Sequence, residues 1–374
     1  MAKRILISAG GTGGHVYPAQ ALAKKLKAEN PELYIFFAAA GLEGNQFFDR
    51  ESFPYQEVSA GYFPLKRPLK CMASFGKLIA GLWQSDRLLK KIAPDLIIGF
   101  GSYHTLPLLL AARLRKIPYI LHEANSIPGK VNKLMSKGAL ATGILFPDAR
   151  NYLKGNVVEV DLPLRDTLNN SFMTREKAIE HYSLDPDKTT LLFFGGSQGA
   201  ASLNHLAIET VSNLKDWKKT IQILHFTGRE KETSKIAHLY NDLKLTAYVK
   251  DYEENMEFAW MAGDLLISRS GAGTIAEEIA YEKPGLLIPY PMAADNHQER
   301  NAFFMSDKVK GALTLIEKNL TGKKLASVII SLLEDNNKAL LQLRDHIIQF
   351  KMNTVRKDFC EFIKATYNGS KERS

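Results

Sequence analysis

Three short segments of this sequence combine glycine with small hydroxyl side chains directly after apolar runs. They are Gly10–Gly14, Gly195–Gly199 and Ser270–Thr274. A glycine turn between a strand and a helix points backbone N–H groups outward at the positive end of the helix dipole, where phosphate groups bind. A single loop of this kind is equally well explained as a tight turn, because short motifs have low specificity. Three of them together favour a phosphate-bearing ligand.

The first loop does not fit the common nucleotide motifs. The dinucleotide fingerprint needs a third glycine where this sequence has Val16, and the candidate acid, Glu43, comes late in the chain. The Gly-Lys-Ser/Thr ending of an ATPase phosphate loop is also missing. We therefore expect neither a nicotinamide cofactor nor ATP hydrolysis, and no other cofactor.

Two ionisable side chains follow these loops. His15 begins the helix after the first loop, where the positive helix end should favour the neutral imidazole that a general base needs. Glu277 lies one turn beyond Gly273, where it can accept hydrogen bonds from ribose hydroxyls. Helix capping or packing by His15, and first-turn helix stabilisation by Glu277, remain alternatives.

Short apolar runs alternate with helical stretches along the chain, which predicts parallel sheets covered on both faces. Among the expected helices are Pro18–Ala28, Ala73–Ile92 and a final stretch over Leu341–Ile363. The expected strands are Arg4–Ser8, Tyr34–Ala38, Asp95–Gly99, Pro118–His122, Ala141–Phe146, Thr190–Phe194, Gln222–Thr227, Leu265–Ser268 and Gly285–Pro289.

An internal repeat predicts two domains. The segments Ile5–Gly14 and Leu191–Gly199 both read as apolar strand, glycine loop and helix, about half the chain apart. We expect an α/β protein with two Rossmann-like, doubly wound parallel-sheet domains facing a cleft, because ligands bind beyond the carboxyl ends of parallel strands. The expected domains are residues 1–164 and 165–340, with a helical segment over 341–374 that crosses back to the first domain.

Bulk composition narrows the class of protein without choosing a function. Lysine and arginine outnumber aspartate and glutamate by 49 to 40, giving a net charge of +9. This excess suits an anionic membrane, a phosphorylated substrate, a nucleic acid, or simply a basic surface. Two cysteines, Cys71 and Cys360, support neither a disulfide framework nor a paired-cysteine metal site. With no apolar signal region and no uninterrupted apolar run near the ~20 residues of a spanning helix, we expect a soluble or membrane-surface protein.

Five motifs in order carry a family resemblance. Together they closely resemble the MurG family, the N-acetylglucosaminyltransferases of peptidoglycan synthesis, over about Lys3–Ala312. The resemblance implies the GT-B fold and a UDP-N-acetylglucosamine-dependent hexosyltransferase. The implied enzyme would transfer N-acetylglucosamine to the muramoyl sugar of lipid I, giving lipid II, and the configuration at the transferred sugar would be inverted. The motifs are Ala9–Pro18, His122–Gly129, Gly195–Ala200, Arg269–Thr274 with Glu277, and Asp295–Gln298 before Asn301-Ala302.

The resemblance also assigns roles to residues in the first half of the chain. His15 would be the candidate base on the acceptor hydroxyl. Thr12, Gly13 and Gly14 would lie near the donor diphosphate or the acceptor. Asn125 would help to order the catalytic cleft.

In the second half, the resemblance assigns residues to the donor. Ser197 would touch its phosphates, and Glu277 would bind the ribose. Gln298 would read a sugar hydroxyl, and Glu253 matches a position that contacts uracil through its backbone. The segment Ala272, Gly273 and Thr274 would cradle the nucleotide together with Glu277.

One motif departs from the family pattern. The family usually carries Gly-Asn-Pro-x-Arg at the domain junction, and this chain has Asp161-Leu162-Pro163-Leu164-Arg165. Arg165 keeps its place and would still reach the donor phosphates, whereas Asp161 and Leu162, which replace the usual Gly-Asn, would alter hinge closure or donor affinity.

The single Asp-x-Asp spacing, Asp185-Pro186-Asp187, reads as a turn before a strand, so we expect no bound metal.

A helix in the first half suits contact with a membrane. Its apolar residues recur at helical spacing and are surrounded by basic ones, as in an interfacial helix on anionic lipid. The alternative is that the stripe belongs to the core. Because the implied acceptor carries a lipid, we expect a peripheral protein on the cytoplasmic face of the inner membrane. The apolar residues are Phe75, Leu78, Ile79, Leu82 and Trp83, and the basic ones are Lys66, Arg67, Lys70, Lys77, Arg87, Lys90 and Lys91.

Other functions stay open at this point. The chain can be another GT-B glycolipid synthase with a different acceptor, a UDP-sugar epimerase, or a non-catalytic UDP-sugar-binding protein. A nucleic acid partner is not expected, since the sequence contains no recognised nucleic-acid-binding module. Each alternative predicts a different product or none.

Overall fold

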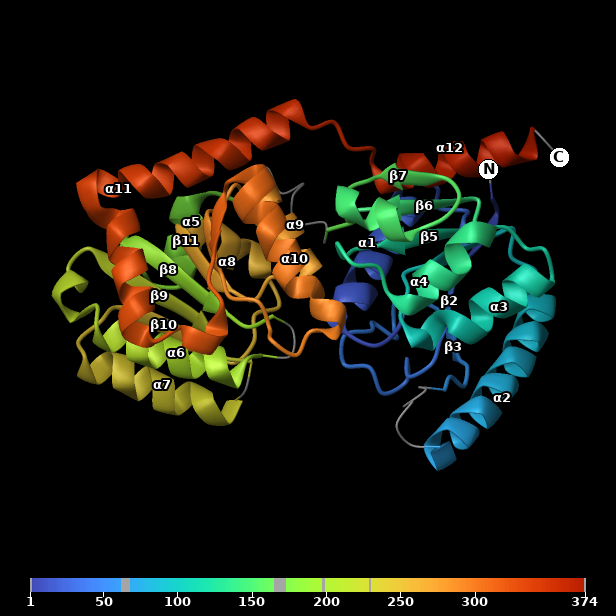
Figure 1. The fold of residues 1–374 in the computed structure, drawn as a ribbon, viewed down its shortest axis with the longest axis horizontal. Helices are drawn as coiled ribbons and strands as arrows, with labels where there is room; N and C mark the ends of the chain where they lie inside the picture. Colours follow the sequence, from blue (N-terminus) through green and yellow to red (C-terminus); the bar gives the residue numbers. More distant parts are fainter. Residues whose placement is uncertain (1, 62–67, 165–172, 197–198, 229, 373–374) are drawn as a thin grey trace. The chain divides into compact units, whose positions relative to one another are not determined.

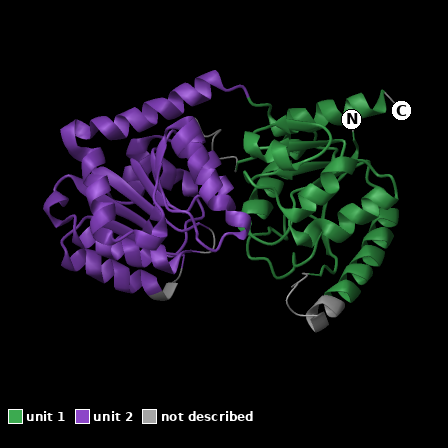
Figure 2. Ribbon diagram, viewed as in Figure 1, with its two compact units in different colours: residues 1–166, 356–374 green, residues 167–355 purple. Residues whose placement is uncertain are grey.

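The computed structural model describes residues 2–61, 68–164, 173–196, 199–228 and 230–372, with backbone only for 68–73 and 230–231. The chain forms two compact units (Figure 2). Unit 1 comprises residues 1–166 and 356–374, and unit 2 comprises residues 167–355. Unit 1 is therefore built from two separate stretches of sequence.

Unit 1 contains one seven-stranded parallel sheet in the order β3-β2-β1-β4-β5-β6-β7 (Figure 1). The chain builds β1 to β3 outward in one direction, then returns to place β4 on the other side of β1. The strands are β1 (Arg4–Ser8), β2 (Tyr34–Ala39), β3 (Tyr55–Glu57), β4 (Leu96–Gly99), β5 (Tyr119–Glu123), β6 (Ala141–Ile144) and β7 (Val157–Glu159).

Helices cover both faces of the unit 1 sheet, as a parallel sheet requires. Side chains alternate along each strand, so Ile5 and Ile7 pack with α1 and α12, whereas Leu6 packs with α2, α3 and α4. The strands therefore read as continuous apolar runs. The helices are α1 (Gly13–Glu29), α2 (Pro68–Ile92), α3 (Leu106–Leu114), α4 (Lys130–Met135) and α12 (Phe359–Lys371).

Unit 2 repeats this plan with a six-stranded parallel sheet in the order β10-β9-β8-β11-β12-β13. Here the chain places β8, β9 and β10 in one direction and returns to set β11 on the other side of β8. The strands are β8 (Thr189–Phe194), β9 (Ile221–Phe226), β10 (Ala247–Lys250), β11 (Leu265–Ser268), β12 (Gly285–Leu287) and β13 (Ala312–Thr314).

The unit 2 core has the same two faces. Leu191 and Phe193 of β8 pack with α6, α7 and α11, whereas Leu192 and Phe194 pack with α5 and α8. The helices are α5 (Arg175–His181), α6 (Ala201–Ser212), α7 (Glu230–Asp242), α8 (Met256–Ala262), α9 (Ala272–Ala280), α10 (His297–Phe303) and α11 (Gly322–Asn353).

The expected doubly wound parallel sheets are confirmed, and all nine expected strands are present with ends within two residues. Four further strands, β3, β7, β10 and β13, were not expected from the sequence. These are the outermost strands of the two sheets. Each has three or four residues, and edge strands are commonly short and less apolar.

The final helical stretch differs from the expected one. The stretch over Leu341–Ile363 is helical but interrupted, because α11 ends at Asn353 and α12 begins at Phe359. Asp358 caps α12 by accepting a hydrogen bond from the N–H of Glu361 at 3.1 Å. Its carboxylate also pairs with Lys25 of α1 at 2.6 Å, which joins the last helix to unit 1.

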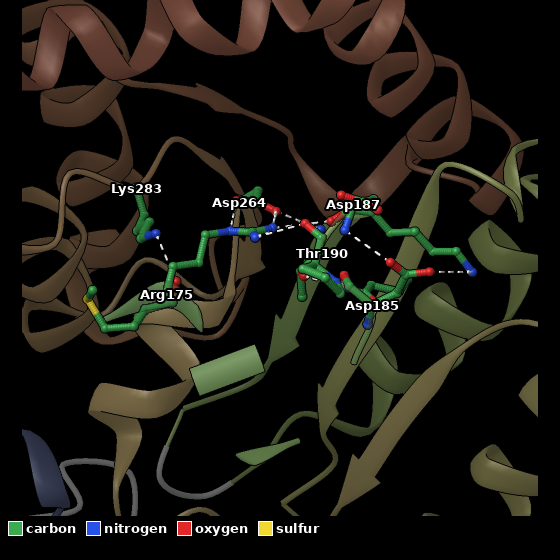
Figure 3. Close-up of polar contacts among 10 residues, drawn as sticks. Arg175, Asp185, Asp187, Thr190, Asp264 and Lys283 are labelled. Carbon is green, nitrogen blue, oxygen red and sulfur yellow. Dashed lines mark hydrogen bonds and ion pairs between the residues drawn. The ribbon is translucent and has the colours of Figure 1, made fainter. Parts of the chain in front are cut away.

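A polar network holds the amino ends of the strands in unit 2 (Figure 3). Arg175 of α5 donates to both carboxylate oxygens of Asp264, at 3.3 and 3.0 Å. Asp264 in turn accepts the N–H of Thr190 at 2.8 Å, so it ties β8 to the residue before β11. Asp185 and Asp187 form a turn before β8, as expected, with the N–H of Asp187 donating to Asp185 at 3.0 Å. These contacts tie α5 to the amino ends of β8 and β11.

Glu278 of α9 gives a prediction about stability. The residue is fully buried, and neither carboxyl oxygen has a hydrogen-bond partner within the described part of the chain. Burial raises its pKa well above the ordinary value, so the folded protein keeps a proton that the unfolded chain releases. Stability should therefore fall as the pH rises above the ordinary range for glutamate, by about 1.4 kcal/mol per pH unit within the window.

Replacing Glu278→Gln should remove this pH dependence. We expect the variant to become progressively more stable than the parent protein as the pH rises from 5 to 8, measured by urea unfolding. Glu180→Gln, at an exposed site on α5, serves as the control. Parallel curves for the Glu278→Gln and parent proteins would show that Glu278 is ionised in the fold.

Candidate active site

Each sheet has one position where the strand order reverses, between β1 and β4 in unit 1 and between β8 and β11 in unit 2. In open parallel sheets the connections diverge there and leave a crevice beyond the carboxyl ends of the strands. The three glycine loops of the sequence follow β1, β8 and β11. Both reversals therefore carry a glycine loop where a ligand is expected.

The first glycine loop leaves no room for a side chain at Gly10. A Cβ added at Gly10 would lie 2.9 Å from the Cβ of His104 and 3.0 Å from the carbonyl oxygen of Ala40. Thr12 is the residue before α1, with extended backbone, and Gly13 and Gly14 are the first two residues of the helix. The backbone N–H groups of a first helical turn have no carbonyl partner within the helix, so this end suits an anion.

His15 lies in the first turn of α1 and is half-buried. Its Nδ1 is 3.3 Å from the Thr12 hydroxyl oxygen, so these two site residues are in contact. His15 also acts on His122 of β5, because its charge helps to lower the pKa of His122. The carboxyl ends of β1 and β5 thus bring two imidazoles near each other.

His122 is buried against aromatic rings rather than exposed for chemistry. Its ring centroid is 5.3 Å from that of Phe100 and 4.8 Å from that of Phe359. Burial, and then the charge of His15, lowers the pKa of His122 to about 3. The ring is therefore neutral near pH 7.

Glu123 organises the loop that follows β5. Its Oε1 accepts the backbone N–H of Asn125 at 2.9 Å. Its Oε2 accepts the N–H of Gly129 and the Nδ2 of Asn132, both at 2.9 Å. Burial raises the pKa of this carboxyl, and the hydrogen bonds oppose the rise. Asn125 therefore has its place set by a buried carboxyl that the sequence analysis assigned no role.

The second glycine loop, in unit 2, also requires glycine. Gly199 has φ +68°, and an added Cβ would lie 2.9 Å from the Cα of Gly228 in the connection after β9. The N–H of Gly199 donates to the carbonyl of Gly196 at 2.9 Å and closes the turn before α6. Ser197 of this loop, like Arg165 at the domain junction, lies outside the described residues.

A buried arginine links the second and third loops. Arg269 follows β11, and its guanidinium donates to the Ser202 hydroxyl at the start of α6 at 2.7 Å. It also donates to Glu317 at 2.8 Å and to the carbonyl of Ile288 at 3.0 Å. An arginine is rarely buried without such partners. This contact sets the two helix starts of unit 2 beside each other.

The third loop leads into α9, whose first residues include the predicted nucleotide contacts. Gly271 precedes the helix with extended backbone, Ala272 is buried, and Gly273 and Thr274 are half-buried. Glu277 is half-buried one turn further along the helix. These residues stand together at the carboxyl end of β11.

Gln298 is joined to the third loop through its backbone. Its carbonyl accepts the Ser270 hydroxyl at 2.7 Å, and its side-chain Oε1 accepts the N–H of Tyr290 at 2.9 Å. This leaves the Nε2 amide of Gln298 as the group that can meet a ligand. Asp295 and Asn296, before α10, have left-handed backbone with φ of 50° and 55°, a conformation that these two residue types adopt more readily than most.

Glu253 lies after β10, the outermost strand on one side of the unit 2 sheet. Its side chain is buried, and its Oε1 accepts the N–H of Asn255 at 3.0 Å. The carboxylate is therefore used to shape this loop, which agrees with a ligand contact made through the backbone. No group of three or more potential metal ligands occurs within the described parts of the chain.

Sequence reasoning missed one imidazole at the unit 1 reversal. His104 follows β4, and its ring lies against Gly10 and Gly11. Its Nδ1 is 2.8 Å from the hydroxyl oxygen of Ser102. Ser102 has φ 71° and ψ 150°, a conformation adopted almost only by glycine, which costs about 1–3 kcal/mol in other residues. His104 and the first glycine loop come together only because β1 pairs with β4, so no local sequence motif could have pointed to His104.

Residues 5–144 match the glycosyltransferase family 28 N-terminal domain, and residues 190–357 match the family 28 C-terminal domain. The chain is also 43% identical, over 98% of its length, to an enzyme of Protochlamydia amoebophila (strain UWE25). The match covers 96% of that enzyme, whose name is UDP-N-acetylglucosamine–N-acetylmuramyl-(pentapeptide) pyrophosphoryl-undecaprenol N-acetylglucosamine transferase.

This chain belongs to the MurG family of glycosyltransferases. A Chlamydia pneumoniae member with the same name is 34% identical and aligns over 96% of this chain and 98% of its own length. The MurG crystal structure from Acinetobacter baumannii superposes with a TM-score of 0.75 at 25% identity, covering 98% of this chain and 99% of that one. The resemblance found in the sequence motifs is therefore confirmed.

More distant structures support the fold alone. Medicago truncatula UGT71G1, in a structure complexed with UDP-glucose, gives a TM-score of 0.69 at 13% identity and covers 98% of both chains. The GT-B fold expected from the MurG resemblance is confirmed by these likenesses and by the two doubly wound sheets. The chain is accordingly a glycosyltransferase.

The Glu123 contacts give a test of how the site is held. Glu123→Gln replaces one accepting oxygen with an N–H donor, so at least one buried donor loses its partner, which costs about 1–3 kcal/mol. We expect reduced stability and a lower turnover, because the loop bearing Asn125 loosens. UDP affinity should be unchanged if the nucleotide binds to unit 2.

Thermal unfolding, turnover and UDP calorimetry measure these three effects on one preparation. Glu32→Gln, at an exposed position in unit 1, is the matched control. A variant with lower stability but the turnover of the parent protein would show that Glu123 serves the fold and has no influence on catalysis.

Proposed function

We propose that this protein transfers N-acetylglucosamine from UDP-N-acetylglucosamine to the muramoyl sugar of lipid I, producing lipid II for peptidoglycan synthesis. The observation that carries the proposal is the 43% identity, over nearly the whole of both chains, to an enzyme named for that transfer. The substrates, residue roles and membrane location below are part of the same proposal.

Unit 2 is the donor unit in this proposal. Its second and third glycine loops supply helix-start N–H groups for the diphosphate, and Arg269 sets the two starts side by side. Glu277 binds the ribose, Gln298 donates its Nε2 amide to a sugar hydroxyl, and the backbone at Glu253 meets the uracil. Ala272, Gly273 and Thr274 cradle the nucleotide, with Ser197 on the phosphates. Arg165, whose place in the sequence belongs to unit 1, is also assigned to the phosphates.

Unit 1 is the acceptor unit. The hydroxyl oxygen of the muramoyl sugar attacks the anomeric carbon of the donor while His15 takes the hydroxyl proton. Thr12, in contact with His15, keeps the imidazole oriented, and Asn125 orders the loop beside it. UDP leaves from the opposite side, so a single displacement inverts the configuration. Donors aimed at the diphosphate stabilise the charge that develops there.

The direct test is incubation of the protein with UDP-N-acetylglucosamine and a lipid I analogue, followed by mass spectrometry. The expected product is the acceptor with one added N-acetylglucosamine, together with UDP. Transfer to another lipid acceptor would favour a glycolipid synthase. Conversion of the UDP-sugar without acceptor would favour an epimerase.

His15→Ala should reduce turnover by about 10²–10⁴-fold, the usual contribution of a placed general base. UDP affinity should change little, because the proposed nucleotide contacts other than Arg165 lie in unit 2. Turnover and UDP calorimetry are measured separately, with His238→Ala, at an exposed site on α7, as the control. Near-normal turnover of a folded His15→Ala protein would exclude His15 as the base.

The apolar stripe on α2 divides into a packed side and an exposed side. Leu78 and Leu82 are half-buried, whereas Phe75, Ile79 and Trp83 are 58%, 54% and 57% exposed. The sequence left open whether the stripe is core or surface, and these three side chains are surface. Within the described parts of the chain, no helix is long and apolar enough to span a membrane.

Basic and apolar groups beside the exposed stripe support its proposed contact with an anionic membrane. The guanidinium of Arg87 lies 4.1 Å from the ring centroid of Trp83, and Lys77, Lys90 and Lys91 are exposed. Leu114, at the end of helix α3, which packs on α2, is also exposed, at 73%. Lys66 and Arg67 lie outside the described residues, and for Lys70 only the backbone is described.

Replacing Phe75 and Trp83 together by serine should lower binding to vesicles of anionic lipid in a flotation assay, because it removes two exposed apolar anchors. The control exchanges Leu341 and Met352, two exposed apolar residues of α11, for serine. If the folded Phe75/Trp83 variant floats like the parent protein, the membrane contact lies elsewhere.

A further inference from the structure

A small pocket lies beside the first glycine loop and is not used by the residues assigned to the transfer reaction. Its volume is about 280 Å³, at the low end for small-molecule sites. It lies between the connections that follow β1, β2 and β4, all in unit 1. Its walls include Gly11, Gly41, Gly44, Asn45, Phe47 and His104.

The lining of this pocket suits an uncharged polar ligand. Gly41 and Gly44 let a ligand approach the backbone, and the ring of Phe47 provides an apolar surface. Asn45 closes the wall by donating to the carbonyl of Gly11 at 2.8 Å. Among the described residues, none that lines the pocket carries a full charge. A diphosphate would therefore meet no cation here, whereas hydroxyl and amide groups would meet hydrogen-bonding partners.

The ring of His104 has close neighbours in this wall. Tyr103 packs against it in a tilted arrangement with ring centroids 3.9 Å apart, and Gly10 and Gly11 of the first glycine loop lie close to it. Its Nδ1 is engaged with the Ser102 hydroxyl, which leaves Nε2 as the ring nitrogen available to a ligand. Burial lowers the pKa of His104, against the opposing charge of Glu57, so the ring is neutral near pH 7.

The backbone conformation of Ser102 indicates that the orientation of the His104 imidazole is functionally important. A glycine would adopt φ 71° and ψ 150° without strain, yet the position carries serine. The serine hydroxyl is the group that a glycine would lack, and it bonds His104 at 2.8 Å. Strain of this kind is typically retained where a site needs a fixed side chain.

We propose that His104 is an acceptor-binding residue whose Nε2 hydrogen-bonds a hydroxyl or amide of the uncharged sugar–peptide part of the acceptor, seated in this pocket. Ser102 is the positioning residue that aims the imidazole. The inference rests on the transfer reaction proposed above. The pocket shares the first glycine loop with His15, so a sugar bound there lies on the loop that bears the candidate base.

The test is steady-state kinetics on the full chain, with a soluble lipid I analogue and UDP-N-acetylglucosamine each varied in turn. His104→Ala should raise the KM for the acceptor about tenfold, the loss of roughly one hydrogen bond, with the donor KM within about twofold of the parent value. His104→Gln, whose amide can still reach the pocket, should recover part of the acceptor affinity. His238→Ala is the control.

Two Ser102 variants separate binding from folding. Ser102→Gly should raise the melting temperature by releasing backbone strain and yet raise the acceptor KM, because His104 loses its partner. Ser102→Ala should raise the acceptor KM without the gain in melting temperature. A purely structural role would move stability and activity in the same direction.

An unchanged acceptor KM in a folded His104→Ala protein overturns the inference and leaves the proposed function standing. Equal rises in both KM values together with a lower melting temperature also overturn it, since they indicate a structural role. If the parent protein transfers no sugar to the lipid I analogue, the proposed function fails and this inference falls with it.

Discussion

The contact between Gly10 and His104 is the constraint on which unit 1 depends. Where the strand order reverses, the turn after β1 must pass directly over the connection after β4, and the separation leaves no space for a Cβ. Glycine at this point lets the backbone enter α1 at once and turns its first N–H groups outward. Because the two connections pass so close together, position 10 has no room for a side chain, and the imidazole of His104 lies beside the loop.

Unit 2 meets the same requirement with different chemistry. At its reversal the connections after β8 and β11 are joined by the guanidinium of Arg269, which donates to Ser202, Glu317 and backbone carbonyl groups. A buried cation needs several partners, so its burial fixes many groups at once. Unit 1 therefore relies on close packing of glycine and imidazole, and unit 2 on a hydrogen-bonded cation. In both, the helix starts are oriented by contacts between segments far apart in sequence.

The sequence predicted the elements whose information is local. Apolar runs marked every inner strand, and glycine marked the loops between strand and helix. The four outer strands escaped because each has a single neighbour and few residues, so its apolar pattern is weak. Candidate site residues were proposed where they belong to a contiguous motif, as His15 and Glu277 do. Glu123 and Arg269 belong to motifs, but the motifs do not reveal which residues these two side chains contact. His104 belongs to no motif. For Arg269 and His104 the contacting residues are far apart in the sequence and come together only when the strands pair.

The last helix of the chain completes the first unit rather than the second. Phe359 of α12 packs on His122 and Phe100, and Phe362, Ile363 and Tyr367 join the core formed by α1 and the first strand. During synthesis on the ribosome, unit 2 emerges whole while the core of unit 1 still lacks one wall. Domains generally fold as they emerge, the N-terminal one first. In this protein the sheet behind His15 is sealed only after the whole of unit 2 has been made.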